Sequence, residues 1–327
     1  MKKFKFRAVC LFTMLFAVAQ LVWAQSDRHI EYPTYFAPVN GISIAYQEFG
    51  ERSNPTVLLV MGLGAQLIHW DDALVLQLVE QGFHVVRFDN RDIGMSEKLY
   101  KADTPGFMEM IKFQLGWDLG APYDLSDMGA DAMGLMDYLG IEQVHVVGAS
   151  MGGMIAQVMA YEYPERVLSL TSVMSSSGAP HLPEGTFEVQ FRDRDDLSRD
   201  EILEQSVVAM KAIYAKESER THEEWLKIAA RGHDRSHYDD GFARQIWAVL
   251  QTGDRTELLQ DLALPTVVIH GKLDPLLPLA HGEHTAELIP GADLVVWEDF
   301  GHFLGVEHHA RLVSEIDRII QSAVATP

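Results

Sequence analysis

The stretch Val146-Val147-Gly148-Ala149-Ser150-Met151-Gly152-Gly153 decides the fold of this chain. It continues an apolar, β-branched run that starts at Val144, and a helical pattern from Met154 to about Tyr163 follows it. The G-x-S-x-G spacing arises by chance in many chains, but a position between a strand and a helix is typical of a turn that exposes a serine hydroxyl. Because that hydroxyl is a weak nucleophile, it must project clear of the sheet to meet substrate and base. The context predicts Ser150 as a nucleophile on a strained turn.

The glycines around Ser150 fit this interpretation. Gly148 and Gly152 keep bulk away from both sides of the serine, and Gly153 lets the following helix pack closely on adjacent strands. That helix aims the positive end of its dipole at the serine, which favours a developing oxyanion. The alternative that stays open is a glycine-rich turn without chemistry.

Away from this turn, short apolar runs alternate with helical patterns. Helices are expected at Asp71–Gln81 and in a segment capped by Ser126 that runs to Leu139. The stretch Ser26–Phe36 shows no clear period and predicts an exposed lead-in. The alternation predicts an α/β fold with a mostly parallel, doubly wound sheet and helices on both faces. The expected strands are Ile42–Phe49, Thr56–Met61, His84–Asp89, Val144–Ala149, Leu168–Met174, Thr266–Gly271 and Asp293–Glu298.

The alternation breaks once, over residues 175–262, where the sequence is charged and favours helices such as 199–216 and 221–231. We expect a helical lid there, inserted over the carboxyl ends of the strands, where ligands bind in open α/β sheets. The core then comprises residues 25–174 and 263–327. The lid contains aromatic side chains that are candidates for a substrate pocket, although packing within the lid is the favoured role for each. They are Trp225, Tyr238, Phe242 and Trp247.

A nucleophilic serine needs a base, and the base needs an acid that orients it. Asp274 follows the expected strand at 266–271, and His302 lies in a loop after the last strand. The chain order Ser150, Asp274, His302 is the one expected of this architecture. The competing histidines are His270, which reads as packed within a strand, His281 and His284 in a helix, and His308 and His309 in the C-terminal helix. The competing acids are Glu298 and Asp299, which are too close in sequence to His302 to approach its ring from behind easily.

An oxyanion hole is expected from two backbone N–H groups. The first belongs to Met151, the residue after the serine. The second belongs to Leu63, in the glycine-rich loop 61–65 that follows the first core strand. A plain turn at this loop is the alternative.

Composition narrows the possible functions. Hydrophobic residues make up 47% of the 327 residues, which argues against a disordered chain. The net charge of −21 makes nucleic acid an unfavourable partner. The one cysteine, Cys10, excludes a disulfide framework, a cysteine nucleophile in the folded part and a cysteine-based zinc site. The expected chemistry needs no metal and no organic cofactor.

Residues 1–24 have the layout of a secretory signal peptide. A basic start precedes the apolar run Ala8–Trp23, and small residues at Val22 and Ala24 favour cleavage before Gln25. The chain is therefore expected to be exported, periplasmic or secreted, with no stable membrane insertion after cleavage. The alternative is an uncleaved segment that anchors the chain in the membrane.

Taken together, the motifs resemble the α/β-hydrolase superfamily from about Tyr35 to the C-terminus. The stretch 128–157 is similar to the lid-bearing serine esterase branch, which includes methylesterases. Residues 89–96 look like a structural loop of the family that usually reads D-x-R-G-x-G-x-S, with Asp92 in place of the first glycine. Most relatives also carry His-Gly where this chain has Met61-Gly62.

The resemblance implies a serine hydrolase that cleaves a carboxylic ester of a small molecule through an acyl-enzyme intermediate. Thioesterase, lactonase, amidase and perhydrolase chemistry on the same fold stay open as alternatives. So does a non-catalytic binding protein built on a degenerate hydrolase domain. The sequence leaves the acyl-chain size and the oligomeric state undetermined.

Overall fold

The computed structural model describes residues 32–104, 106, 111–112, 115–186, 197–214 and 220–325. The chain from Tyr35 onward forms one compact unit. The predicted signal peptide, residues 1–24, lies outside the described residues. Within the ranges given, no helix combines the length and the apolar character that spanning a membrane requires.

An eight-stranded sheet forms the centre of this unit, in the order β1-β2-β4-β3-β5-β6-β7-β8. The strands β1 and β2 pair antiparallel, β2 runs antiparallel to β4, and the remaining neighbours are parallel. The parallel strands β3, β4, β5 and β7 are buried along their whole length, as expected where both faces are covered. The bounds are β1 Tyr35–Val39, β2 Ile42–Phe49, β3 Thr56–Val60, β4 His84–Phe88, β5 Val144–Ala149, β6 Val167–Val173, β7 Thr266–Gly271 and β8 Asp293–Trp297.

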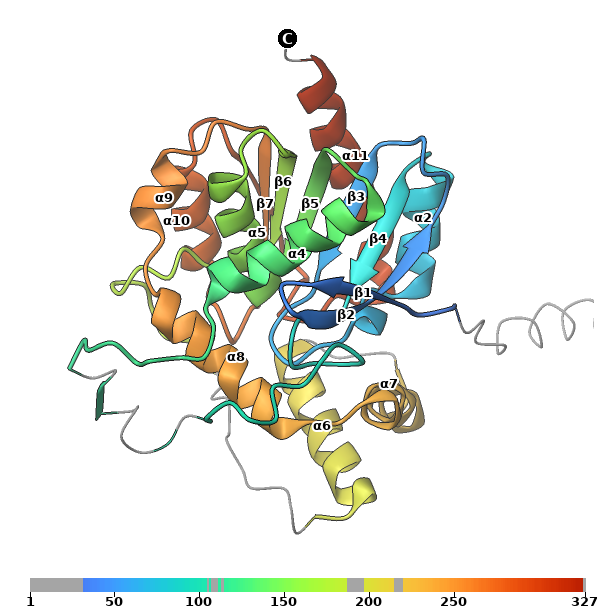
Figure 1. The fold of residues 1–327 in the computed structure, drawn as a ribbon, viewed down its shortest axis with the longest axis vertical. Helices are drawn as coiled ribbons and strands as arrows, with labels where there is room; N and C mark the ends of the chain where they lie inside the picture. Colours follow the sequence, from blue (N-terminus) through green and yellow to red (C-terminus); the bar gives the residue numbers. More distant parts are fainter. Residues whose placement is uncertain are drawn as a thin grey trace, which may run out of the picture. The chain divides into compact units, whose positions relative to one another are not determined.

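Helices cover both faces of the sheet (Figure 1). The helices α4 and α5 pack together against one face, and α2 and α11 pack together against the other. The bounds are α2 Asp72–Glu80, α4 Leu125–Leu139, α5 Met151–Glu162, α9 Thr256–Gln260, α10 Ala280–Leu288 and α11 His309–Ala325, with short 3₁₀ turns η1 Leu67–His69 and η2 Val306–His308. The α/β class and the mostly parallel sheet predicted from sequence are confirmed.

Some details differ from the sequence-based prediction. The strand β1 begins within the last two residues of the expected lead-in and was not predicted, since only its alternate residues Ala37 and Val39 are buried and its apolar signal is weak. The cap of α4 is Asp124 rather than Ser126, because its carboxylate accepts the N–H of Asp127. His308 ends the turn η2, so the C-terminal helix begins one residue later.

The segment between β6 and β7 contains the helices α6 Arg199–Tyr214, α7 His222–Arg235 and α8 Asp239–Thr252, followed by α9. Figure 1 shows α6, α7 and α8 grouped beside one another at one end of the sheet. Polar contacts tie them to loops at the carboxyl ends of the strands. Arg235 pairs with Asp89 at 2.8 Å.

The most buried of these contacts joins Arg244 of α8 to Asp92. The guanidinium meets the carboxylate through two hydrogen bonds of 2.9 and 3.0 Å, and the two side chains are 1% and 0% exposed. Asp92 stands where the family motif carries glycine, and its backbone keeps the left-handed conformation that glycine favours, with φ 69°. The substitution therefore preserves the turn and adds an anchor for α8.

Replacing Arg244 with methionine should destabilise the protein. The change leaves the Asp92 carboxylate buried without its partner, which typically costs about 3–5 kcal/mol of unfolding free energy. Urea unfolding followed by circular dichroism measures the loss. The matched control is Arg199→Met, which breaks an exposed pair with Asp234 and should change little. Equal stability of the two variants would contradict the prediction.

Candidate active site

Ser150 lies on a strained turn between β5 and α5. Its backbone has φ 55° and ψ −122°, in a region that L-residues rarely adopt. A side chain on Gly152 would collide with the carbonyl oxygen of Val60, and one on Gly148 would collide with Gly152. The glycines of the motif thus allow α5 to begin directly at Met151, three residues before the helical pattern suggested.

The structure brings Ser150, His302 and Asp274 into one hydrogen-bonded line. The Oγ of Ser150 lies 2.9 Å from Nε2 of His302, and Nδ1 of His302 lies 2.6 Å from Oδ2 of Asp274. The histidine and the aspartate are each 6% exposed. This arrangement allows a proton to pass from the serine hydroxyl to the ring, while the carboxylate fixes the tautomer with hydrogen on Nδ1.

Hydrogen bonds to the Asp274 carboxylate itself and from His270 hold the loop that carries Asp274. The second oxygen of Asp274, Oδ1, accepts the backbone N–H groups of Leu276 and Leu277 at 2.9 and 2.8 Å. His270 donates its Nε2–H to the carbonyl of Leu277 at 2.8 Å. Burial lowers the pKa of His270, so the ring stays neutral and keeps this role at neutral pH.

The loop that carries His302 is fastened to the end of α6. The N–H of His302 donates to the carbonyl of Ile213 at 2.7 Å. The next residue, Phe303, packs edge-on against Tyr214 and Trp225, with ring centroids 6.0 and 5.3 Å away. The inserted helices therefore help to position the histidine. Sequence reasoning missed this support, because nothing in the pattern of α6 indicates its partner.

The competing histidines and acids have other partners. His281 and His284 lie in α10, as predicted, and contact Ser176 and Ser177. The two acids near His302 point elsewhere, since Glu298 pairs with Lys272 and Asp299 pairs with Arg311.

The loop 61–65 lies against the serine. A side chain on Gly62 would come within 3.0 Å of Cβ of Ser150 and within 2.9 Å of the carbonyl oxygen of Ala149. Asn90 donates to the carbonyl of Met61 at 2.8 Å and so ties the start of the loop to the end of β4. In the described part of the chain, neither of the two expected oxyanion donors, the N–H groups of Leu63 and Met151, has an acceptor. Both are thus available to a bound oxygen atom.

The aromatic side chains predicted as pocket candidates have different partners in the structure. Trp225 is fully buried with Val207 and Tyr214, which confirms packing within the inserted helices. Tyr238 accepts a hydrogen bond from Arg244, and Phe242 lies against Gly64.

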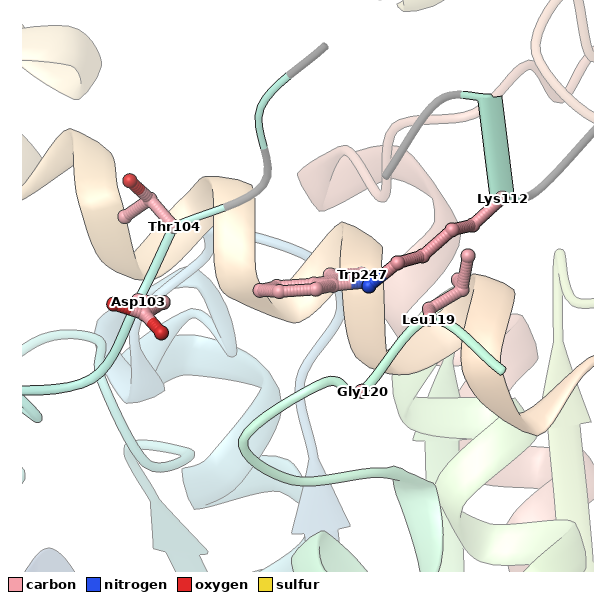
Figure 2. Close-up of a pocket in the computed structure, with 6 residues that line it drawn as sticks. All are labelled: Asp103, Thr104, Lys112, Leu119, Gly120 and Trp247. Atoms are coloured by element: carbon pink, nitrogen blue, oxygen red, sulfur yellow. The ribbon is translucent and has the colours of Figure 1, made fainter. Parts of the chain in front are cut away.

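Trp247 lines a pocket of about 390 Å³ beside α8. Figure 2 shows its ring among the other lining residues, which come from the segment before α4. Neither Ser150 nor His302 lines this pocket. The lining residues are Asp103, Thr104, Lys112, Leu119, Gly120 and Trp247.

Known proteins share both the sequence pattern and the fold. A family model described as the alpha/beta hydrolase fold matches residues 55–309. Rhodomycin D methylesterase from Streptomyces peucetius is 25% identical over 307 residues, covering 87% of this chain and 97% of that enzyme. A bifunctional esterase/perhydrolase from Acinetobacter calcoaceticus is 26% identical over 283 residues, covering 82% and 92%.

Among solved structures, a meta-cleavage product hydrolase from Pseudomonas fluorescens superposes with a TM-score of 0.69 at 20% identity, covering 88% of this chain and 98% of that one. A thermophilic esterase from Thermogutta terrifontis gives a TM-score of 0.65 at 22% identity, covering 89% and 99%. These two likenesses concern the fold. Because the family model spans most of the chain and the observed sheet has the same architecture, this chain belongs to the α/β-hydrolase-fold family.

Proposed function

We propose that this chain is a serine hydrolase that cleaves a carboxylic ester of a small molecule through an acyl-enzyme intermediate. The observation that carries the proposal is the hydrogen-bonded line from Asp274 through His302 to Ser150. Relatives named as a methylesterase and as an esterase/perhydrolase add support for ester chemistry.

In the first half of the reaction, Oγ of Ser150 attacks the ester carbonyl carbon while Nε2 of His302 takes the hydroxyl proton. The carbonyl oxygen becomes an oxyanion and accepts the N–H groups of Leu63 and Met151. The tetrahedral intermediate then expels the alcohol. The bond from carbon to the alcohol oxygen breaks, and His302 returns the proton to that oxygen.

In the second half, a water molecule attacks the acyl-serine and gives its proton to His302. The oxyanion forms again in the same place, and the bond to Oγ of Ser150 breaks as His302 returns the proton to the serine. The carboxylate of Asp274 stabilises the imidazolium in both halves. The carboxylic acid leaves, and no metal or organic cofactor takes part in these steps.

The acyl and alcohol groups are best identified by a substrate panel. A series of p-nitrophenyl esters from acetate to long acyl chains reports the size of the acyl site. Lactone and thioester panels, run beside it, test the other chemistries that this fold supports. The inserted helices α6–α8 act as the lid in this proposal and line the substrate side of the site.

Ser150→Ala should abolish hydrolysis of p-nitrophenyl butyrate. Removing the nucleophile of a serine triad costs about 10⁴-fold or more in kcat. The control is Ser126→Ala on α4, where the hydroxyl donates to Glu162 away from the triad, and turnover should match the wild type. Wild-type turnover no faster than that of Ser150→Ala would favour a non-catalytic binding protein.

Asp274→Asn should lower kcat by about 10⁴-fold, because the amide stabilises the wrong tautomer of His302. Steady-state kinetics on the same ester measure the loss. Asp299→Asn removes the competing acid in the loop that carries His302. It serves as the matched control, and we expect its kcat to be unchanged. If Asp299→Asn were the damaging change, Asp274 would lose its assigned role.

We also propose that residues 1–24 export the chain, with cleavage after Ala24. The basic start and the apolar run Ala8–Trp23 support this proposal. Mass spectrometry of the exported protein should find Gln25 at its amino terminus. A chain that keeps Met1 and stays in the membrane fraction would instead indicate an uncleaved anchor.

A further inference from the structure

Gln245 of α8 joins the inserted helices to the loop beside the serine. Its side chain is 0% exposed. Its Oε1 accepts the backbone N–H of Gly64 at 2.9 Å, and its Nε2 donates to the carbonyl of Arg91 at 3.0 Å. One amide group therefore connects the loop after β3 to the loop after β4, and both of its polar atoms are used.

The bond to Gly64 acts on the peptide next to an expected oxyanion donor. The N–H of Ala65 donates to the carbonyl of Gly62 at 3.2 Å, which closes a four-residue turn around Leu63. In a trans peptide the N–H points opposite to the C=O. Because the carbonyl of Gly62 points into this turn, the N–H of Leu63, which belongs to the same peptide, points out of it.

Besides the hydrogen bond from Ala65 to Gly62, α8 supports this turn from outside. Gly64 has φ 68°, and Phe242 of α8 lies directly against it. Phe242 and Gln245 are three residues apart and so share one face of the helix. The same helix is anchored to the core through the buried pair of Arg244 and Asp92.

We propose that Gln245 is a positioning residue for ester hydrolysis, which holds the turn 62–65 so that the N–H of Leu63 faces the oxyanion. The proposal rests on the proposed function, because it concerns a donor used only when the tetrahedral intermediate forms. It also gives the inserted helices a second role besides covering the substrate. Through Gln245, α8 completes the catalytic geometry.

The test is Gln245→Met, which keeps the length of the side chain and removes both hydrogen bonds. We expect kcat for p-nitrophenyl butyrate to fall about 10- to 100-fold, because a small misplacement caused by a remote change can cost this much, while KM stays nearly unchanged. An alkylboronic acid, which forms a tetrahedral adduct with the serine, should bind more weakly by the same factor. Titration of active sites with a phosphonate ester normalises kcat to folded enzyme.

The matched control is Thr252→Val on the same helix. The hydroxyl of Thr252 accepts the N–H of Leu125 in α4, and its hydrogen bonds within the described part of the chain do not reach the loop 61–65. Loss of the bond to Leu125 should lower the melting temperature and leave kcat per active site unchanged. If Gln245→Met does not fold, Gln245→Asn gives the second variant, since its shorter amide cannot bridge both backbone groups.

The outcomes separate the two proposals. Wild-type kcat and boronate affinity in a folded Gln245 variant would overturn the role of Gln245 and leave the serine hydrolase standing. A change in KM with kcat unaffected would also overturn this role. So would a fall in total activity that matches the fall in the number of titratable active sites. If turnover by the wild-type protein does not exceed that of Ser150→Ala, both the proposed function and this inference are overturned.

Discussion

The close approach of α5 to the carboxyl end of β3 is the constraint on which the site depends. No side chain can stand at Gly152, because it would meet the carbonyl oxygen of Val60. This contact lets the helix start at Met151 immediately after the strand, which forces Ser150 into its strained conformation. The same contact sets the start of the loop 61–65 beside the serine, so the N–H groups of Leu63 and Met151 belong to adjoining pieces of backbone. Packing between one helix and one strand thus sets the conformation of Ser150 and brings the two expected oxyanion donors onto adjoining backbone.

The inserted helices contribute to the site from the opposite side. They contact the histidine loop through the carbonyl of Ile213 and the loop 61–65 through Gln245. These are single hydrogen bonds of modest net energy, so their value lies in direction rather than in stability. A catalytic group held within a fraction of an ångström needs support on every side. The sheet gives this support on one side of the site, and α6 and α8 give it on the other side.

Sequence patterns predicted the parts of the fold that each element determines by itself. The buried strands were predicted within one residue or so, because apolar runs such as Val144–Ala149 report burial on both faces directly. The order Ser150, Asp274, His302 identified the three side chains that meet. The edge strand β1 was missed, because three of its five residues are exposed and Pro38 interrupts the pattern. The contacts of Gln245 could not be predicted either, since its partner Gly64 lies 181 residues away and periodicity describes only the helix to which Gln245 belongs.

Asp92 shows how a departure from a motif acquires meaning only in three dimensions. In sequence it replaces a glycine in a structural loop, and holding a non-glycine residue at φ 69° costs about 1–2 kcal/mol. The carboxylate offsets that cost by accepting two hydrogen bonds from Arg244 and the N–H of Leu99. Since Arg244 and Gln245 are consecutive in α8, the ion pair fixes the helix at the point where the amide reaches the loop 61–65. The strained aspartate is therefore connected, through two consecutive residues of α8, to the loop 61–65 beside the serine. Glycine at this position would keep the turn but leave the guanidinium of Arg244 buried without its carboxylate, which explains why the aspartate and the arginine belong together.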